Sequence, residues 1–289
     1  MKRKTLTKPG SKGKTLRDFE QLHGGDRVKD LRRQLNIEHA KVESLAEIQG
    51  RVIVEKVSDC SLRFAVTGDR HTGSLFHHSG ALHGFYEYAQ SQGVSCVYDA
   101  GDILAGHKVY RGQEFELRDL GFEAQLARLV KDAPRTIPTK FITGNHDASF
   151  KSLAGVPVGK MIEQAVPEYE FLGEEQARVS FNTPRGDFVL QLIHPGGGSA
   201  YALSYKPQKI VESLEGGSKP NMLAIGHFHK AEFMPSYRNV ATLQAGTFEK
   251  QTPFMARQGL AAHVGGWIVN VNIGTTYNII STEFVAFYV

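Results

Sequence analysis

From residue 62 onward the chain alternates between short apolar segments and longer amphipathic segments. Such alternation predicts buried strands joined by helices, and therefore an α/β fold. We expect helices over residues 73–93, 115–132 and 207–215 and in a proline-interrupted region that ends near residue 167. The expected strands cover residues 62–66, 94–100, 139–143, 188–193, 221–225, 241–246, 265–273 and 282–289.

Polar side chains follow five of these strands directly, in most cases after a glycine. The carboxyl ends of parallel strands meet at one edge of a sheet, and this edge is where α/β proteins build their sites. A glycine there allows a sharp turn and a close approach of the backbone to a bound group. The five motifs are Gly68-Asp69-Arg70-His71, Gly101-Asp102, Gly144-Asn145-His146-Asp147, His194, and Gly226-His227-Phe228-His229.

The residue types in these motifs suit a divalent metal site. Carboxylates, imidazoles and an amide oxygen bind hard to borderline cations, and the motifs contain no thiolate. The two cysteines, Cys60 and Cys96, are too few for a disulfide framework or a zinc cluster. The motifs hold more ligands than one ion needs, so we expect two ions if one carboxylate bridges them.

The order of the motifs resembles that of the calcineurin-like metallophosphoesterase superfamily, over residues 62 to about 250. The resemblance implies a two-sheet sandwich flanked by helices. The small N-terminal helical segment that we expect from the residue pattern lies outside the match. The same resemblance implies two metal ions that are bridged by the carboxylate of Asp102. The first ion would be held by Asp69, His71, Asp102 and His229, and the second by Asp102, Asn145, His194 and His227.

Three further residues are candidates for catalysis. The resemblance places His146 against the substrate phosphate, where it protonates the leaving oxygen, and makes Asp147 a partner that fixes His146 or its loop. A simple turn carboxylate is the alternative for Asp147. Arg70 lies between two ligands, and either contacts phosphate or forms a surface salt bridge.

The resemblance predicts a binuclear hydrolase of phosphoric esters. Mn²⁺ is the expected ion, and Fe, Zn²⁺, Ni²⁺ or Co²⁺ would fit the same ligands. The stretch GDILAGHKVYRG and the Gly-Asn-His-Asp motif differ from the protein-phosphatase branch of the superfamily, which argues against phosphoprotein substrates. We expect a nuclease-like phosphodiesterase; the alternatives are an enzyme for nucleotides or other small phosphoesters, and a nucleic-acid-binding module with a structural metal.

The N-terminal segment carries the positive charge of the protein. Residues 1–33 contain eleven Lys and Arg and four Asp and Glu, a net of +7, which leaves −3 for the rest of a chain whose total is +4. Basic arms bind phosphate backbones through counterion release, although a solvated tail is the alternative. We expect a flexible arm over residues 1–25, a helical segment and strand over residues 26–60, and the metallophosphoesterase domain over residues 61–289. The helical segment is either a helix-turn-helix that contacts DNA or a cap on the core.

Composition limits the location. No stretch approaches the roughly 18 consecutive apolar residues of a membrane span, and no apolar region follows the basic N-terminus as in a secretory signal. The low cysteine content favours a reducing compartment, so we expect a cytoplasmic protein that does not interact with membranes.

Overall fold

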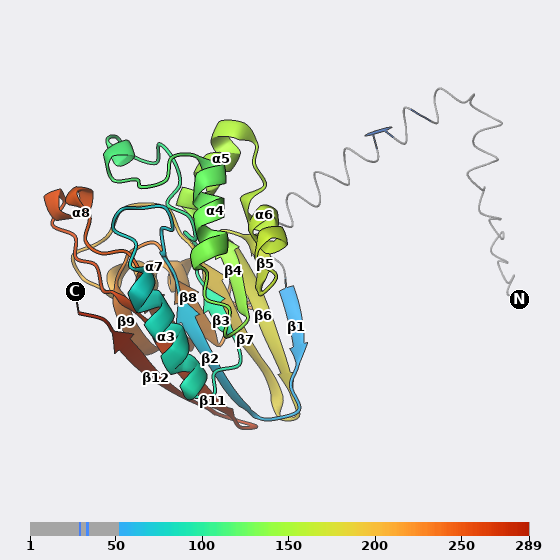
Figure 1. The fold of residues 1–289 in the computed structure, drawn as a ribbon. Helices are drawn as coiled ribbons and strands as arrows, with labels where there is room; N and C mark the ends of the chain where they lie inside the picture. Colours follow the sequence, from blue (N-terminus) through green and yellow to red (C-terminus); the bar gives the residue numbers. More distant parts are fainter. Residues whose placement is uncertain (1–28, 30–32, 35–51, 289) are drawn as a thin grey trace, which may run out of the picture. The chain divides into compact units, whose positions relative to one another are not determined.

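The computed structural model describes residues 29, 33–34 and 52–288 (Figure 1). The chain divides into two compact units, Met1–Ala46 and Glu47–Val289, and every strand described here belongs to the larger one. The predictions for the arm and for most of the helical segment lie outside the described residues. The predicted division at residues 25 and 60 therefore stays a prediction. The strand that we expect within residues 26–60 is β1 (Val52–Lys56), which pairs in parallel with β6 of the larger unit.

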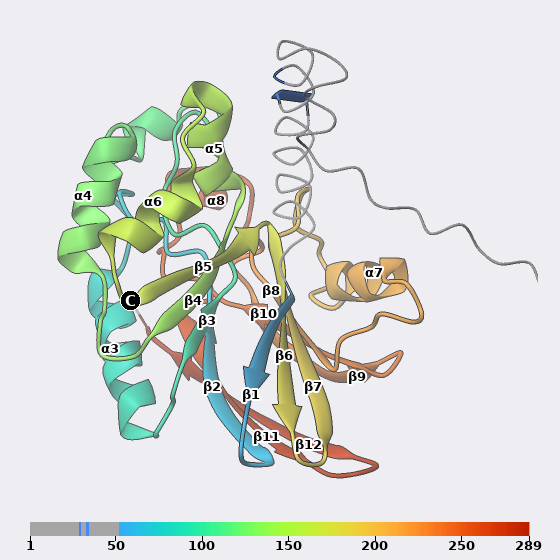
Figure 2. The same cartoon turned by 90° about the vertical axis from the view of Figure 1, so that its right-hand side faces the viewer.

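Two six-stranded mixed sheets form the body of the larger unit (Figure 2). The first has the order β1-β6-β7-β8-β10-β9 and the second the order β12-β11-β2-β3-β4-β5. The remaining strands of the first sheet are β6 (Gln176–Thr183), β7 (Gly186–Ile193), β8 (Met222–Ile225), β10 (Val240–Ala245) and β9 (Ala231–Tyr237). The second sheet contains β12 (Asn278–Ala286), β11 (Gly265–Ile273), β2 (Ser61–Thr67), β3 (Val97–Asp99), β4 (Thr139–Thr143) and β5 (Tyr169–Glu174).

The main core lies between the two sheets. Phe64 and Tyr98 of the second sheet pack against Phe181 of the first, and each of their ring centroids lies 6.0 Å from that of Phe181. Leu190 and Leu192 of β7 are fully buried in the same cluster. Alternate residues of these strands face the core, which is the periodicity expected of a strand with one face on another sheet.

Helices cover the outer faces of both sheets (Figures 1 and 2). On the second sheet, α3 packs through Phe85 against Ile268, while helices α4, α5 and α6 surround Phe141 and Phe171. On the first sheet, α7 packs through Val211 against Leu223. The helices are α3 (Ser79–Ser91), α4 (Phe122–Asp132), α5 (Asn145–Ala154), α6 (Val158–Ala165), α7 (Tyr205–Ser213) and α8 (Pro253–Arg257), with the 3-10 turn η1 (Gln113–Phe115).

The predicted α/β sandwich flanked by helices is confirmed, with two corrections to the helices. The helix expected over residues 73–93 begins only at Ser79, because Gly73 has a φ of +105° and Ser74 N donates to His71 O in a turn (2.9 Å). The helix expected over 115–132 begins at Phe122, after Gly121 with a φ of +82°. Strands β5, β6 and β9 were not predicted. No helix among the described residues is long and apolar enough to cross a membrane.

Candidate metal centre

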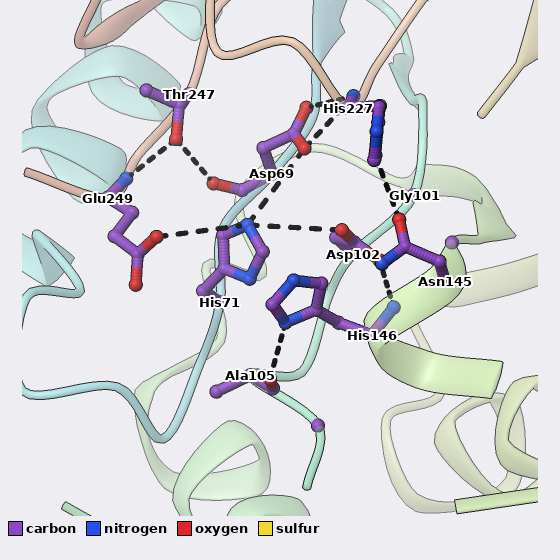
Figure 3. Close-up of polar contacts among 12 residues, drawn as sticks. Asp69, His71, Gly101, Asp102, Ala105, Asn145, His146, His227, Thr247 and Glu249 are labelled. Atoms are coloured by element: carbon purple, nitrogen blue, oxygen red, sulfur yellow. Dashed lines mark hydrogen bonds and ion pairs between the residues drawn. The ribbon is translucent and has the colours of Figure 1, made fainter. Parts of the chain in front are cut away.

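The five predicted motifs meet at one end of the sandwich. Strands β2, β3 and β4 are parallel neighbours, so Asp69, Asp102 and Asn145 leave the second sheet at the same edge. Strands β7 and β8 are parallel neighbours in the first sheet and deliver His194 and His227. The two sheet edges face each other, and the polar side chains point toward a common centre (Figure 3).

One group of ligand atoms surrounds the position expected for the first ion. His71 Nε2 lies 3.0 Å from His229 Nε2 and 3.9 Å from Asp102 Oδ2. His229 Nε2 lies 3.3 Å from Asp69 Oδ1. Atoms bound to one ion at about 2.1 Å lie about 3.0–3.4 Å apart in octahedral or tetrahedral geometry. The four side chains are therefore already close to the spacing that a shared ion requires.

A second group has the same spacing and shares the Asp102 carboxylate. His194 Nε2 lies 3.1 Å from Asp102 Oδ2 and 3.1 Å from Asn145 Oδ1. Asn145 Oδ1 lies 2.8 Å from His227 Nδ1. The structure thus brings together all seven predicted ligands, Asp69, His71, Asp102, Asn145, His194, His227 and His229, in two groups that share Asp102.

The hydrogen bonds of two histidines fix which ring nitrogen is free. His194 Nδ1 donates to Ala100 O (2.7 Å), and His227 Nε2 donates to Gly197 O (2.6 Å). Since a carbonyl only accepts, His194 Nε2 and His227 Nδ1 present lone pairs to Asp102 and Asn145 when the rings are neutral. A cluster of lone pairs is stabilised by a cation. Here the cation is either a proton on His194 or a metal ion, so the residues present fit the implied metal.

Comparisons with known proteins find similar solved structures at low sequence identity. No family model matches the sequence, and no curated protein does. Solved structures that are similar include GAP50, the anchor in the inner membrane complex of Plasmodium, at 14% identity, with 79% of this chain and 85% of that chain covered and a TM-score of 0.49. A predicted phosphoesterase from Streptococcus pneumoniae has 12% identity, covers 78% and 90%, and has a TM-score of 0.37. Vps29 of Entamoeba histolytica complexed with Zn²⁺ has 13% identity, covers 78% and 99%, and has a TM-score of 0.36.

Most of the predicted ligands occupy an unusual backbone conformation. A left-handed φ costs a non-glycine residue about 1–2 kcal/mol, so it persists only where its surroundings require it. Here the loops are tied to each other: Asp69 N donates to Gly101 O (2.8 Å), His71 N to Asp102 O (3.0 Å) and His227 N to Asp69 Oδ2 (2.9 Å). The left-handed ligands are Asp69 (φ +53°), His71 (+49°), Asp102 (+56°), His227 (+79°) and His229 (+54°).

Two of the motif glycines are required by this close approach of loops. Gly101 has a φ of +98°, and a Cβ there would lie 2.8 Å from His194 Nδ1. A Cβ on Gly144 would collide with the Asp102 carboxylate. Larger residues at either position would therefore push away a ligand.

His146 and Asp147 lie in the first turn of α5, directly after the predicted ligand Asn145. His146 N donates to Asp102 Oδ1 (2.8 Å), and His146 Nδ1 donates to Ala105 O (2.6 Å), which leaves Nε2 as the free ring nitrogen (Figure 3). His146 also falls within ligand distance of His71 and Asp102, so the geometry alone allows it to be a ligand or an acid.

Asp147 is fully buried and holds the loop that carries Asp102. Its carboxylate accepts hydrogen bonds from the backbone N atoms of Ile103 (3.1 Å), Leu104 (2.8 Å) and Gly144 (2.9 Å). Burial and the nearby charge of Asp102 raise the pKa of Asp147 to about 7, against the effect of these three N–H groups. The predicted role in fixing the loop agrees with these contacts, because a simple turn carboxylate would explain the bond from Gly144 N but not those from Ile103 N and Leu104 N on a different loop.

Arg70 does not face the substrate. Its side chain is completely buried, with Nε 2.7 Å from Asp99 Oδ2, Nη1 donating to Tyr169 Oη (2.5 Å) and Nη2 donating to Tyr86 Oη (2.7 Å). Burial lowers the pKa of Arg70, but the charge of Asp99 and the two tyrosines more than offset this and raise it. The predicted phosphate contact is wrong, and the predicted salt bridge is present but buried rather than at the surface. The guanidinium holds the Asp69–His71 turn in place through its buried contacts with Asp99, Tyr86 and Tyr169.

The sequence analysis missed Asp99 and Glu249. Asp99 is the last residue of β3 and was taken as part of an apolar strand. Glu249 Oε2 lies 3.9 Å from His71 Nε2, and Thr247 Oγ1 links its backbone to Asp69 (Figure 3). A signal existed, because β10 is followed by Gly246 and then by Thr-Phe-Glu, which is similar to the strand-glycine-polar pattern of the five motifs.

The centre concentrates negative charge. Asp69, Asp99, Asp102, Asp147 and Glu249 are all buried, whereas Arg70 is the one buried Arg or Lys in the part of the chain that the structure describes. Burial raises the pKa of Glu249 to about 7, and Asp102 outweighs burial to raise the pKa of His194 to about 10. Buried carboxylates need cations or hydrogen bonds to stay ionised. Divalent ions would supply the missing positive charge and displace the proton of His194.

We predict that Arg70→Met lowers the free energy of unfolding by about 3–5 kcal/mol, because it leaves Asp99 buried and unpaired. Arg70→Lys keeps the charge but not the fork of three donors, so we expect a smaller loss. Both should also weaken metal binding, since Arg70 lies between Asp69 and His71. Urea unfolding and calorimetric titration with Mn²⁺ measure the two effects. The matched double variant Arg70→Met/Asp99→Asn should regain part of the stability. A single-variant loss below about 1 kcal/mol would contradict a buried ion pair.

Proposed function

We propose that this protein is a hydrolase of phosphodiester bonds that uses two divalent metal ions, with Mn²⁺ as the ion and nucleic acid as the substrate class. The observation that carries the proposal is the pair of ligand groups that share Asp102, with His146 beside them. In such two-ion sites the metals activate a water and neutralise the charge that develops on the phosphoryl group. Since Cys60 and Cys96 are both free thiols, a reducing cytoplasm is the location that we propose.

The residues of the chain have separable roles in this proposal. Asp102 would bind both ions, and its second oxygen accepts a hydrogen bond from His146 N, which fixes the imidazole against the centre. The Ala105 carbonyl holds the proton on His146 Nδ1, so a second proton on Nε2 is the one that the ring donates to the leaving oxygen. Asp147 keeps both loops in place through their backbone N–H groups.

The alternative functions differ in substrate. A substrate panel with added Mn²⁺ separates them: a chromogenic phosphodiester, a phosphomonoester, and labelled single- and double-stranded DNA. Hydrolysis of the diester and of DNA supports the proposal, whereas preference for the monoester supports a small-molecule phosphatase. A chain that binds metal but hydrolyses none of these would have a structural metal site only.

We predict that Asp102→Asn abolishes diester hydrolysis and reduces the number of bound Mn²⁺ ions, because the bridge between both ligand groups loses its charge. Asp187→Asn is the matched control: this aspartate is exposed on β7, far along the strand from His194, and should leave both measurements unchanged. Metal analysis together with turnover of the chromogenic diester provides the readout. Near-normal turnover of Asp102→Asn would exclude the binuclear arrangement.

We predict that His146→Ala retains the bound ions but loses most of the rate on substrates with poor leaving groups. A general acid contributes about 10²–10⁴-fold, and a nitrophenolate leaving group needs much less of that help. The comparison of a nitrophenyl diester with DNA therefore serves as an internal control. Loss of metal in this variant would instead make His146 a ligand, and equal slowing of both substrates would exclude its role as an acid.

We propose that residues 1–25 hold nucleic acid near the site. This segment carries seven Lys and Arg and two Asp and Glu, while the chain beyond residue 33 has a net charge of −3, which repels a polyanion. The charge of the arm offsets that repulsion.

Deleting residues 2–25 should weaken DNA binding and flatten the dependence of log affinity on log salt, whose slope follows the number of phosphates contacted. Hydrolysis of the small chromogenic diester should not change. An arm of the same length with its Lys and Arg replaced by Gln is the control for length. If affinity and slope both survive the deletion, the arm does not bind nucleic acid, and the small-molecule alternative becomes stronger.

A further inference from the structure

The cavity above the metal centre extends well beyond the ligand atoms. It has a volume of about 530 Å³, and the part of its lining that we call the floor contains the predicted ligands His71, Asp102, Asn145, His227 and His229. Gly197 to Ser199 of the loop after His194 form one side. The apolar part of the lining, which we call the wall, combines Val109, Tyr110, Phe254, Met255 and Leu260, from the segment after Asp102 and from α8 and the loop that follows it.

Two aromatic rings form the centre of this apolar wall. Tyr110 and Phe254 stack with ring centroids 4.3 Å apart and an angle of 23° between the rings. They come from segments more than a hundred residues apart in the sequence, so the stack forms only in the folded chain. The Tyr110 ring is also 6.3 Å from the His146 ring, which places the wall directly beside the proposed acid.

Hydrogen bonds hold the wall in place before any ligand binds. The buried Glu116 accepts from Tyr110 Oη (2.7 Å) through one oxygen and from Phe254 N (2.9 Å) through the other. Thr252 caps α8, with its Oγ1 accepting from Met255 N (3.2 Å). A wall fixed in this way loses little conformational entropy when a ligand binds to it.

We propose that this wall is a subsite for the nucleobase of the substrate, which rests on the proposed function for the phosphate end of the same ligand. The cavity joins an anion-binding floor to a flat apolar side, so it suits a ligand with a phosphate and a planar ring. A preformed aromatic surface favours a flat base over a flexible alkyl chain, because stacking on any base face is favourable. Gln258 also lines the cavity and offers an amide to the polar edge of a base.

The proposed base subsite does not involve the two tyrosines that follow Gly196, Gly197 and Gly198. Tyr201 and Tyr205 follow the same loop, and a base stacked on them would be an alternative on the basis of sequence. However, the Tyr201 side chain is fully exposed, and neither ring lines the cavity. Tyr201 is therefore a control position rather than part of the subsite.

The test compares two ligands that differ only in the base. Adenosine 5′-monophosphate and ribose 5-phosphate are titrated calorimetrically into the full chain with saturating Mn²⁺. We expect the nucleotide to bind on the order of tenfold more tightly, the scale of one stacked base. Phe254→Leu should remove most of that difference without changing the affinity for ribose 5-phosphate, whereas Phe254→Tyr should preserve the difference. Tyr201→Ala should behave as the unmodified protein.

Several outcomes would overturn the subsite. Equal affinities for the two ligands, or no binding of either, would exclude it. A loss of both affinities in Phe254→Leu would show that the wall only supports the metal loops. A phosphorothioate-linked adenosine dinucleotide separates the sources of the base: tighter binding than the mononucleotide assigns the subsite to a nucleic-acid chain, and weaker binding assigns it to free nucleotides.

Failure of the proposed function remains distinguishable from failure of the subsite. Hydrolysis of the chromogenic diester is measured on the same preparation. Base-dependent binding without hydrolysis would leave the subsite standing and reject the phosphodiesterase. Hydrolysis without base-dependent binding would do the reverse.

Discussion

The crowding of carboxylates at one end of the sandwich is the constraint on which the rest of the structure depends. Asp69, Asp99, Asp102, Asp147 and Glu249 are buried there, and two of these, Asp147 and Glu249, have pKa values raised to about 7. A folded chain tolerates such crowding only when each group has a compensating partner. Asp99 has the guanidinium of Arg70, and Asp147 has three backbone N–H groups. Asp69 and Asp102 face mainly imidazoles, and these are the carboxylates that a pair of divalent ions would neutralise.

The fold brings these groups together by placing parallel strand ends from two sheets opposite each other. Five of the ligands then adopt a left-handed backbone, which turns each side chain sharply toward the centre. Hydrogen bonds between neighbouring loops, such as Asp69 N to Gly101 O, stabilise these turns. Beneath them, the Arg70–Asp99 ion pair and the two tyrosine hydroxyls form a rigid base. The cost of the left-handed backbone at the predicted ligands is therefore offset by this buried ion pair and its tyrosine partners. These buried side chains do not line the cavity.

The floor and the wall of the cavity have different chemistry. The floor consists of charged and ring-nitrogen ligands, and its geometry suits the reaction that we propose. The wall consists of apolar side chains that are fixed by hydrogen bonds to Glu116. It lies beside His146 and contains none of the predicted metal ligands. This division is typical of ligand pockets, where a few polar groups orient a molecule and an apolar surface contributes affinity. In this protein the two parts come from different segments, so substitutions can separate catalysis from recognition.

The sequence by itself determined the α/β alternation and the five strand-end motifs, because strand periodicity and residue chemistry are local properties. The seven predicted ligands followed from the resemblance in motif order, and the fold brings their side chains together. It misplaced the starts of two helices, where glycines with positive φ interrupt an otherwise helical pattern. It also gave Arg70 the wrong role and missed Asp99 and Glu249. Only the tertiary structure decided these cases. Whether a charged side chain faces solvent, substrate or a buried partner depends on residues distant in the sequence, such as Tyr86 and Tyr169 for Arg70. The aromatic wall exists for the same reason, since Tyr110 and Phe254 meet only when α8 folds over the loop that follows β3.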